Sequence, residues 1–322
     1  EAVAVLRRAV EVAPEAARVH SSLGRALVLA GEIEEGLRSC EQARRLDPLD
    51  SLVRRDQVAA LLAADRGGEA QRVAKQAAKD CPELCLALTA VGEAQLMVGD
   101  LEGALATLAK AIELAPAIGR AQRLLARAHY RMGDLAAAEE LLAQATEQRP
   151  RDALAKIALA DARAALGRAD EALALYREVQ GYASRAPAGY AGEAWLLGIR
   201  GAKGSVAPAS TLRIAQFAVD LDPNDDRALR SFALASLRAG DPSSASTACA
   251  RVLATPMLSA RAAAETHLLL ALTEAGRGRM EQASAAIEQA AALEKRADGP
   301  SRDRDALRRE AEELIRSGSE AK

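Results

Sequence analysis

The sequence predicts an all-α protein built from repeated pairs of helices. The amino-acid composition favours helices, because alanine and leucine dominate while aromatic residues make up only 2% of the chain. Prolines recur at a fixed spacing of 34 residues, at Pro14, Pro48, Pro82, Pro116 and Pro150. Proline cannot continue a helix, so each of these prolines is expected to follow the end of one.

The segment before each proline has the pattern of a helix with one apolar face. Before Pro116 lie Ala104, Leu108 and Ala111, whose spacing of four and three residues places them on one side of a helix. The same offsets recur in the other copies, for example at Ala138, Leu142 and Ala145, or at Thr211, Ala215 and Ala218. These segments are expected to be the second helices of the pairs.

A first helix is expected before each second helix, because an apolar residue followed by a small one recurs there. The copies of this mark are Leu23–Gly24, Val91–Gly92, Leu125–Ala126, Leu159–Ala160, Leu197–Gly198, Phe232–Ala233 and Leu270–Ala271. A glycine then joins the two helices, as at Gly31, Gly99, Gly133 and Gly240. Glycine is the residue most often found just after a helix C-terminus.

Together these marks resemble the tetratricopeptide repeat (TPR), whose pattern is W-x2-L-G-x2-Y…A-x3-F…P with a period of 34 residues. The resemblance covers nearly the whole chain. It implies a right-handed superhelical solenoid of about eight helix-turn-helix repeats, with a leading half-repeat and a C-terminal capping helix. It also implies that the first helix of each pair lines a concave groove.

The repeat register divides the chain into four parts. An N-terminal array of a half-repeat and five repeats spans residues 1–183, and TPR-like repeats resume over residues 211–300. Between them, residues 184–210 lose the period and are rich in glycine, alanine, serine and proline, which favours an irregular junction. Residues 301–322 are expected to form a solvating helix and tail, with Leu307 and Ala311 on its apolar stripe.

Composition and motifs point away from catalysis, cofactors and nucleic acid. The formal net charge is only −2, from 43 basic and 45 acidic residues, which does not favour binding to DNA or RNA. No stretch approaches the ~20 apolar residues of a membrane-spanning helix. No motif with metal-ligand or nucleophile spacing is present, so neither an enzyme nor a metal or cofactor site is predicted.

The cysteines show no disulfide pattern. Cys40 and Cys249 fall at equivalent positions on buried helix faces, where cysteine acts as a small hydrophobic residue. Cys81 and Cys85 are expected to flank a turn, and a disulfide between them stays open as an alternative to two free thiols.

An arginine-rich helix face is the main candidate binding site. Arg120, Arg123, Arg127 and Arg131 recur at steps of three and four residues, opposite the Leu125–Ala126 mark. By the resemblance this face lines the groove; Tyr130 borders it, and Arg227 and Arg230 occupy matching places three repeats later. Arginine binds carboxylates with two parallel hydrogen bonds, so we expect an acidic peptide or protein as the partner. The alternative is a solvated face whose charges are balanced by neighbouring carboxylates.

Three aromatic residues form a second candidate site. Tyr182, Tyr190 and Trp195 lie at or beside the irregular junction, and tyrosine and tryptophan are common anchors of protein interfaces. The alternative is that these large side chains fill space between helices whose stacking is altered. Trp195 lies two residues before the apolar mark Leu197, which favours this alternative.

The predicted function is a non-catalytic scaffold that binds a peptide or partner protein, within a bacterial multiprotein assembly. The excess of arginine over lysine and the single asparagine, Asn224, are typical of a GC-rich bacterial genome. Because Glu1 lies inside a repeat, an upstream segment is expected, and two alternatives stay open. The chain could be the docking arm of a larger enzyme, such as a glycosyltransferase or kinase, or a factor for secretion, pilus or polysaccharide assembly at the cell envelope.

Overall fold

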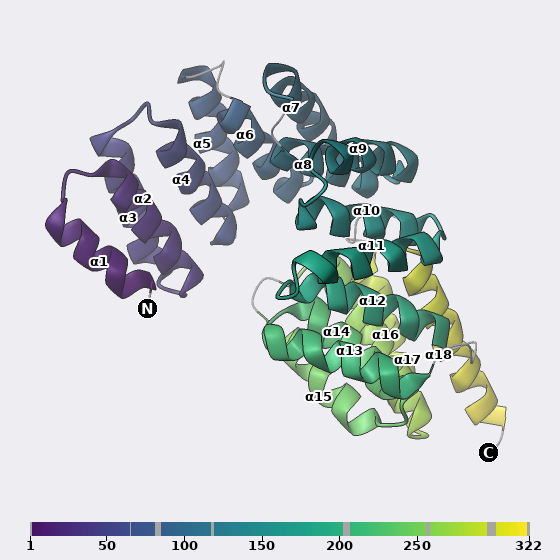
Figure 1. The fold of residues 1–322 in the computed structure, drawn as a ribbon. Helices are drawn as coiled ribbons and strands as arrows, with labels where there is room; N and C mark the ends of the chain where they lie inside the picture. The colour runs from purple at the N-terminus through teal and green to yellow at the C-terminus, as the bar shows by residue number, and fades with distance from the viewer. Residues whose placement is uncertain are drawn as a thin grey trace. The chain divides into compact units, whose positions relative to one another are not determined.

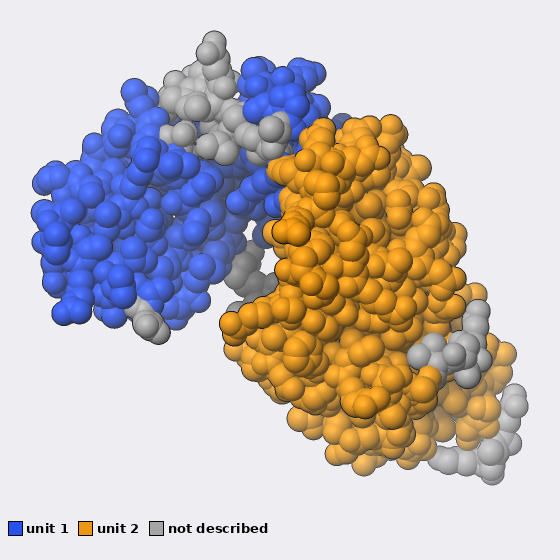
Figure 2. All heavy atoms as spheres, in the orientation of Figure 1, with its two compact units in different colours: residues 1–129 blue, residues 130–322 orange. Residues whose placement is uncertain are grey.

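A computed structural model describes residues 2–64, 66–80, 85–116, 119–201, 207–255, 258–294 and 301–320. These residues form eighteen helices and no strand. The chain divides into two compact units, residues 1–129 and residues 130–322, which are described separately (Figure 2).

Unit 1 consists of a leading helix followed by helix pairs (Figure 1). Its helices are α1 (Ala2–Val12), α2 (Ala17–Leu29), α3 (Ile33–Leu46), α4 (Ser51–Ala63), α5 (Gly67–Asp80), α6 (Cys85–Val98), α7 (Leu101–Leu114) and most of α8 (Gly119–Met132). In this unit α2 packs on α3, α4 on α5 and α6 on α7, and the even-numbered helices pack on one another from α2 to α4 and from α4 to α6.

Unit 2 continues the same arrangement and ends with a single helix. Its helices after α8 are α9 (Leu135–Gln148), α10 (Ala153–Ala165), α11 (Ala169–Tyr182), α12 (Pro187–Gly201), α13 (Pro208–Leu221), α14 (Asp226–Arg238), α15 (Pro242–Leu253), α16 (Ala260–Gly276), α17 (Met280–Glu294) and α18 (Arg302–Glu320). The predicted all-α repeat solenoid is confirmed: eight helix pairs of described residues lie between a leading helix and a last helix.

The predicted buried positions are the core of the helix pairs. Ala104, Leu108 and Ala111 are fully buried on α7. Opposite them, a Cβ atom added to Gly92 of α6 would lie only 2.4 Å from Leu108. The small residue of the apolar–small mark is therefore required, because the second helix of the pair approaches at that point.

The turns within the pairs depend on glycine. Gly31, between α2 and α3, has φ of 89°, a left-handed conformation that side chains with a Cβ atom rarely adopt. Five further glycines have the same conformation: Gly99, Gly133, Gly167, Gly240 and Gly278. In every case a single residue separates the glycine from the start of the second helix of its pair.

Several helix starts are stabilised by a carboxylate that accepts backbone N–H groups. Asp225 caps α14 by accepting from Ala228 N at 2.7 Å, and Asp50 caps α4 through Leu52 N at 2.8 Å. Cys40 and Cys249 are buried free thiols, and burial raises the pKa of each to about 12. Cys81 lies outside the described residues.

The division into units does not follow the predicted boundaries at residues 183 and 210. Those boundaries stay a prediction from the repeat register. The described part of residues 184–210 is mostly helical, because α12 and the start of α13 fall within it; residues 202–206 lie outside the described residues.

Candidate protein-interaction site

Helix α8 has one arginine-rich face and one buried face. Arg120 and Arg127 are exposed, and Arg123 is half-buried, whereas Leu125 and Ala126 are buried as predicted. Arg127 lies seven positions after Arg120, which is about 10 Å along a helix. Arg120, Arg123 and Arg127 belong to unit 1, while Tyr130 and Arg131 belong to unit 2. We call the side of each even-numbered helix that holds positions equivalent to Arg120, Arg123 and Arg127 its inner face.

Carboxylates accompany the arginines on the inner faces of unit 1. Glu93 of α6 accepts a hydrogen bond from Arg120 at 2.5 Å. On α4, Asp56 is almost fully buried and accepts from Arg25 at 3.1 Å and from Arg55 at 2.7 Å. Three arginines of α8 and the pair Arg25 and Arg55 thus lie on these faces together with Glu93 and Asp56.

In unit 2, the other predicted arginines are held by carboxylates of the same unit. Arg227 donates two hydrogen bonds to Asp161 of α10, at 2.5 and 3.0 Å, and one to the Tyr176 hydroxyl at 3.2 Å. Burial disfavours the charged guanidinium, but Asp161 and Tyr176 outweigh it and raise the pKa of Arg227. The Tyr176 hydroxyl in turn donates to Asp161, so all three side chains are hydrogen-bonded to one another.

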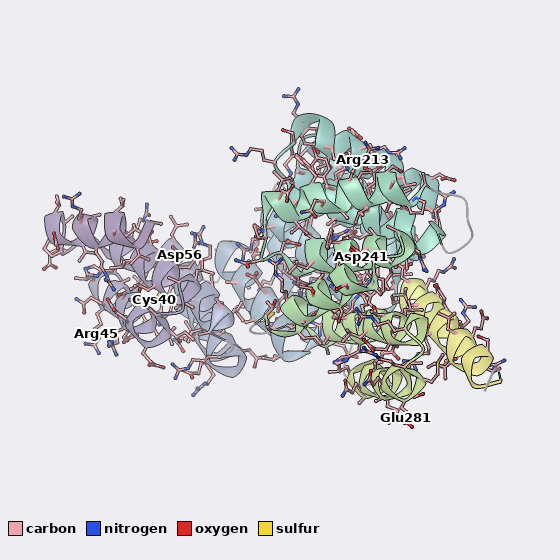
Figure 3. All side chains as sticks on the ribbon, turned by 90° about the horizontal axis from the view of Figure 1, so that it is seen from below. Cys40, Arg45, Asp56, Arg213, Asp241 and Glu281 are labelled. Atoms are coloured by element: carbon pink, nitrogen blue, oxygen red, sulfur yellow. The ribbon has the colours of Figure 1, made fainter. Side chains whose placement is uncertain are left out.

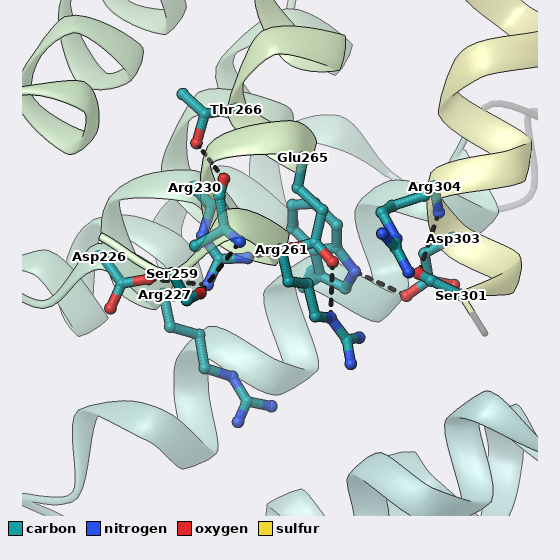
Figure 4. A network of polar contacts seen from close by, with 12 residues as sticks. Asp226, Arg227, Arg230, Ser259, Arg261, Glu265, Thr266, Ser301, Asp303 and Arg304 are labelled. Carbon is teal, nitrogen blue, oxygen red and sulfur yellow. Dashed lines mark hydrogen bonds and ion pairs between the residues drawn. The ribbon is translucent and has the colours of Figure 1, made fainter. Parts of the chain in front are cut away.

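Arg230 belongs to a second cluster, centred on Glu265 of α16 (Figure 4). The Glu265 carboxylate pairs with Arg230 and accepts from Arg261 at 3.0 Å. Arg230 also pairs with Asp226 at 2.9 Å, and Arg261 donates to the Tyr130 hydroxyl at 3.0 Å. Burial opposes ionisation of Glu265, but the neighbouring arginines outweigh it and lower its pKa. We call Glu265, Arg230, Arg261, Tyr130 and Asp226 the Glu265 cluster.

Trp195 lies beside this cluster. Its indole Nε1 donates to Asp303 of α18 at 2.8 Å, and the Arg230 guanidinium lies 5.9 Å from the centre of its ring. Trp195 also packs against the apolar core of α14 and α16. Burial is the main reason that the pKa of Asp303 is raised.

The other two predicted aromatic anchors pack against different apolar clusters from Trp195: Tyr190 lies on α12, the same helix as Trp195, and Tyr182 lies on α11. Tyr190 contacts Phe217 of α13 edge to face, with ring centres 4.8 Å apart, and Phe217 is partly exposed. Tyr182 packs at the end of α11, and the Lys156 ammonium lies 5.4 Å from the centre of its ring. The three residues therefore occupy three separate environments in unit 2.

The sequence did not identify the partners of the unit 2 arginines. Asp161, Arg261, Glu265 and Asp303 carry no local motif, and they contact residues that are 35 to 131 positions away along the chain. Glu265 does occupy the place on α16 that Arg227 occupies on α14, counted from the apolar–small marks, which is the only signal that could have indicated it.

Two searches of the described residues bear on other kinds of site. No described group of three or more histidine, cysteine, aspartate or glutamate residues is arranged to hold a metal ion. Among the helices covered by the structure, none combines the length and apolar character needed to cross a membrane.

Comparison with known proteins gives the family. Two tetratricopeptide-repeat family models match residues 1–51 and 95–160. No curated protein sequence matches the chain. Among solved structures, a chain of the APC/C hetero-tetramer Cut9–Hcn1 is similar, with a TM-score of 0.63 and 17% identity over 87% of this chain and 52% of that chain. The chain thus spans about half the length of that similar protein.

Two other solved TPR structures match less closely. A tetratricopeptide repeat protein from Parabacteroides merdae gives a TM-score of 0.46 with 14% identity, over 94% of this chain and 99% of that chain. A thermophilic TPR protein from Thermus thermophilus gives a TM-score of 0.48 with 23% identity, over 52% of this chain and 92% of that chain. TPR arrays are in general scaffolds for protein–protein interaction. From its repeat pattern, its helix pairs and the two family matches, the chain is a tetratricopeptide-repeat protein.

Proposed function

We propose that the chain is a non-catalytic scaffold that binds an acidic segment of a partner protein on the inner faces of unit 1, centred on α8. The observation that carries the proposal is the row of Arg120, Arg123 and Arg127 along one side of α8. A guanidinium group fits a carboxylate with two parallel hydrogen bonds, so a row of three can fix both the position and the direction of an acidic peptide.

The clustering of arginines on these faces supports an acidic partner. Glu93 and Asp56 already contact Arg120, Arg25 and Arg55, and a bound peptide would share or replace these contacts. Because the net charge of the chain is only −2, the attraction of an acidic peptide would come from these arginines and not from the charge of the whole chain. Binding of this kind weakens as salt concentration rises.

The arginines of unit 2 are less suited to a ligand. Arg227 and Arg230 each have carboxylate partners within unit 2, and Arg230 is 13% exposed. To bind Arg230, an incoming peptide would have to replace its buried contact with Glu265, and breaking a buried ion pair costs about 3–5 kcal/mol. The proposal therefore centres on Arg120, Arg123 and Arg127.

A peptide array tests this function. Acidic, neutral and basic peptides of about ten residues, long enough to cover the α8 face when extended, would be probed with the whole chain. We expect acidic peptides to be selected, and expect Arg123→Glu/Arg127→Glu to lose them, since each charge-assisted contact contributes about 1.5–3 kcal/mol.

The matched control reverses two arginines on a second helix of unit 1. Arg38→Glu/Arg45→Glu changes the net charge by the same amount on α3, where both side chains are exposed; Figure 3 labels Arg45. The control should keep the acidic peptides. If both variants lost binding of the acidic peptides equally, the effect would be one of overall charge. If both variants kept that binding equally, a site on α8 would be refuted.

A further inference from the structure

The last helix, α18, lies against the inner faces of α12, α14 and α16. Its Leu307 and Ala311 are fully buried in one apolar cluster with Leu234 of α14 and Leu268 of α16. Trp195 of α12 packs against the same cluster. A helix that only continued the stack would contact α16 and α17, whereas α18 also reaches α12, which is three repeats earlier than its own position (Figure 1).

Polar contacts from α12 and α14 also hold α18 on this surface. Trp195 Nε1 donates to Asp303 at 2.8 Å. Arg238 of α14 binds the Glu310 carboxylate with both terminal nitrogens, one of them at 2.7 Å, while its Nε donates to the Gly198 carbonyl at 3.0 Å. The surface therefore has one indole hydrogen-bond donor and one fixed guanidinium group, with apolar side chains between them.

Four of the α18 side chains that meet this surface have a regular spacing. Asp303, Leu307, Glu310 and Ala311 are residues i, i+4, i+7 and i+8, which lie on one face of a helix. This is the anchor spacing by which an amphipathic helix binds in the groove of another protein. The contact thus has the form of a receptor with its helical ligand, both on one chain.

The contact of α18 is weakly apolar for a helix of nineteen residues. Leu307 and Ala311 are its only fully buried apolar side chains in the described part of the helix, and Leu314 is partly exposed. Docking also buries the Asp303 carboxylate, whose raised pKa reflects that unfavourable environment. Elements with few buried apolar contacts open at lower free energy than the core.

We propose that the inner faces of α12, α14 and α16 form a second binding surface, which α18 occupies and from which a partner's acidic amphipathic helix displaces it. The partner helix carries a carboxylate, a leucine, a carboxylate and a small residue at i, i+4, i+7 and i+8. This surface belongs to unit 2 and involves none of the α8 arginines, so the inference goes beyond the function proposed above.

A labelled peptide with the sequence of residues 301–320 is the probe. In the whole chain, Leu307→Ser/Glu310→Lys weakens docking of α18 and leaves the receptor surface on α12, α14 and α16 unchanged. Because the intramolecular competitor is then released, we expect the peptide to bind this variant at least about tenfold more tightly than the wild type. A peptide with the same two substitutions should not bind it.

A charge exchange identifies the surface. We call the Leu307→Ser/Glu310→Lys chain the released chain. Adding Arg238→Glu to it should abolish binding of the peptide with the unchanged sequence of residues 301–320. Binding should return when that peptide carries Glu310→Lys alone. Adding Arg123→Glu/Arg127→Glu instead should leave peptide binding unchanged, which separates this surface from the α8 site. A folded released chain, checked by circular dichroism, that binds no peptide would overturn the proposal.

Hydrogen exchange on the wild-type chain covers the case in which the released variant fails to fold. The amides of α18 should exchange faster than those of α16, and excess peptide should accelerate them further. Exchange of α18 only at the rate of α16, unchanged by the peptide, would also overturn the proposal.

Discussion

Replacing Glu265 with glutamine removes the carboxylate that lies between Arg230 and Arg261 and keeps the size of the side chain. The Glu265 side chain is 4% exposed, and its two partners are 13% and 36% exposed. Breaking a buried ion pair costs about 3–5 kcal/mol, because the remaining charge stays buried without compensation. Here Arg230 keeps Asp226 and Arg261 keeps Tyr130, so we expect a smaller loss of about 2–3 kcal/mol in the free energy of unfolding.

The assay is urea denaturation followed by tryptophan fluorescence. Trp195 is the only tryptophan of the chain, and its ring lies 5.9 Å from the Arg230 guanidinium, so its emission reports on the region around the Glu265 cluster. With a urea dependence of about 2 kcal/mol per molar, the loss lowers the unfolding midpoint by about 1–1.5 M. This local probe matters because repeat arrays need not unfold in one step.

The control is Glu281→Gln, which removes an exposed carboxylate on α17 of the same unit (Figure 3). It should shift the midpoint by less than about 0.3 M, as surface substitutions usually do. A midpoint for Glu265→Gln equal to that of the control would refute the reasoning that the cluster stabilises unit 2. A higher midpoint would show that the free-energy cost of burying these charges exceeds the stabilisation from their pairing.

Three further predictions concern thiols, pH and packing. In a Cys81→Ser/Cys85→Ser chain, the buried thiols of Cys40 and Cys249, whose pKa values are about 12, should not react with Ellman's reagent at pH 8 until denaturant is added; reaction in the native state would contradict their burial. Burial opposes ionisation of Asp50, but hydrogen bonds from Arg18 and from the start of α4 outweigh it and lower its pKa. The ionised Asp50 therefore stabilises unit 1 fully above the unfolded pKa of about 3.9, and this stabilisation is lost as pH falls through the lower folded pKa. In Asp50→Asn, the stability of unit 1 measured by circular dichroism should therefore fall less steeply as pH is lowered. Identical pH profiles of the variant and the wild type would contradict this. Gly92→Val should destabilise unit 1 by more than about 2 kcal/mol, because its side chain would overlap Leu108, whereas Gly68→Val, at an exposed glycine with open space around it, should cost much less in the same urea titration.

The fold could be predicted because its signals are local and repeated. The spacing of Pro116 and its equivalents, the apolar–small mark at Gly92 and the turn glycine at Gly31 each act within one helix pair. Stacking of identical pairs then follows, since one pair cannot bury its apolar face alone.

The inner faces were predicted only in part. The position of Arg123 and Arg127 on one side of α8 follows from helix periodicity, and the structure has that arrangement. The contacts of Arg227 with Asp161 and of Arg261 with Tyr130 join helices two and four repeats apart in unit 2. Such contacts depend on how tightly successive pairs curve, and a 34-residue period is compatible with many curvatures.

The position of α18 was also only partly predictable. Its stripe at Leu307 and Ala311 identified an amphipathic last helix, and both side chains are buried. Its contact with Trp195 depends on Asp303, an unremarkable acidic residue 108 positions away in the sequence. Charged residues on an amphipathic helix are usually solvated, so the sequence alone gave no reason to select this one.

The measurement that tests the proposed function most directly is a charge exchange at α8. An acidic peptide and its lysine-substituted counterpart would be titrated by fluorescence anisotropy against the wild-type chain and against Arg123→Glu/Arg127→Glu, at low and at physiological salt. We predict that the wild type binds the acidic peptide, that the variant binds the lysine peptide instead, and that both affinities fall as salt rises. Equal affinity of the acidic peptide for both chains would contradict a binding site formed by the α8 arginines.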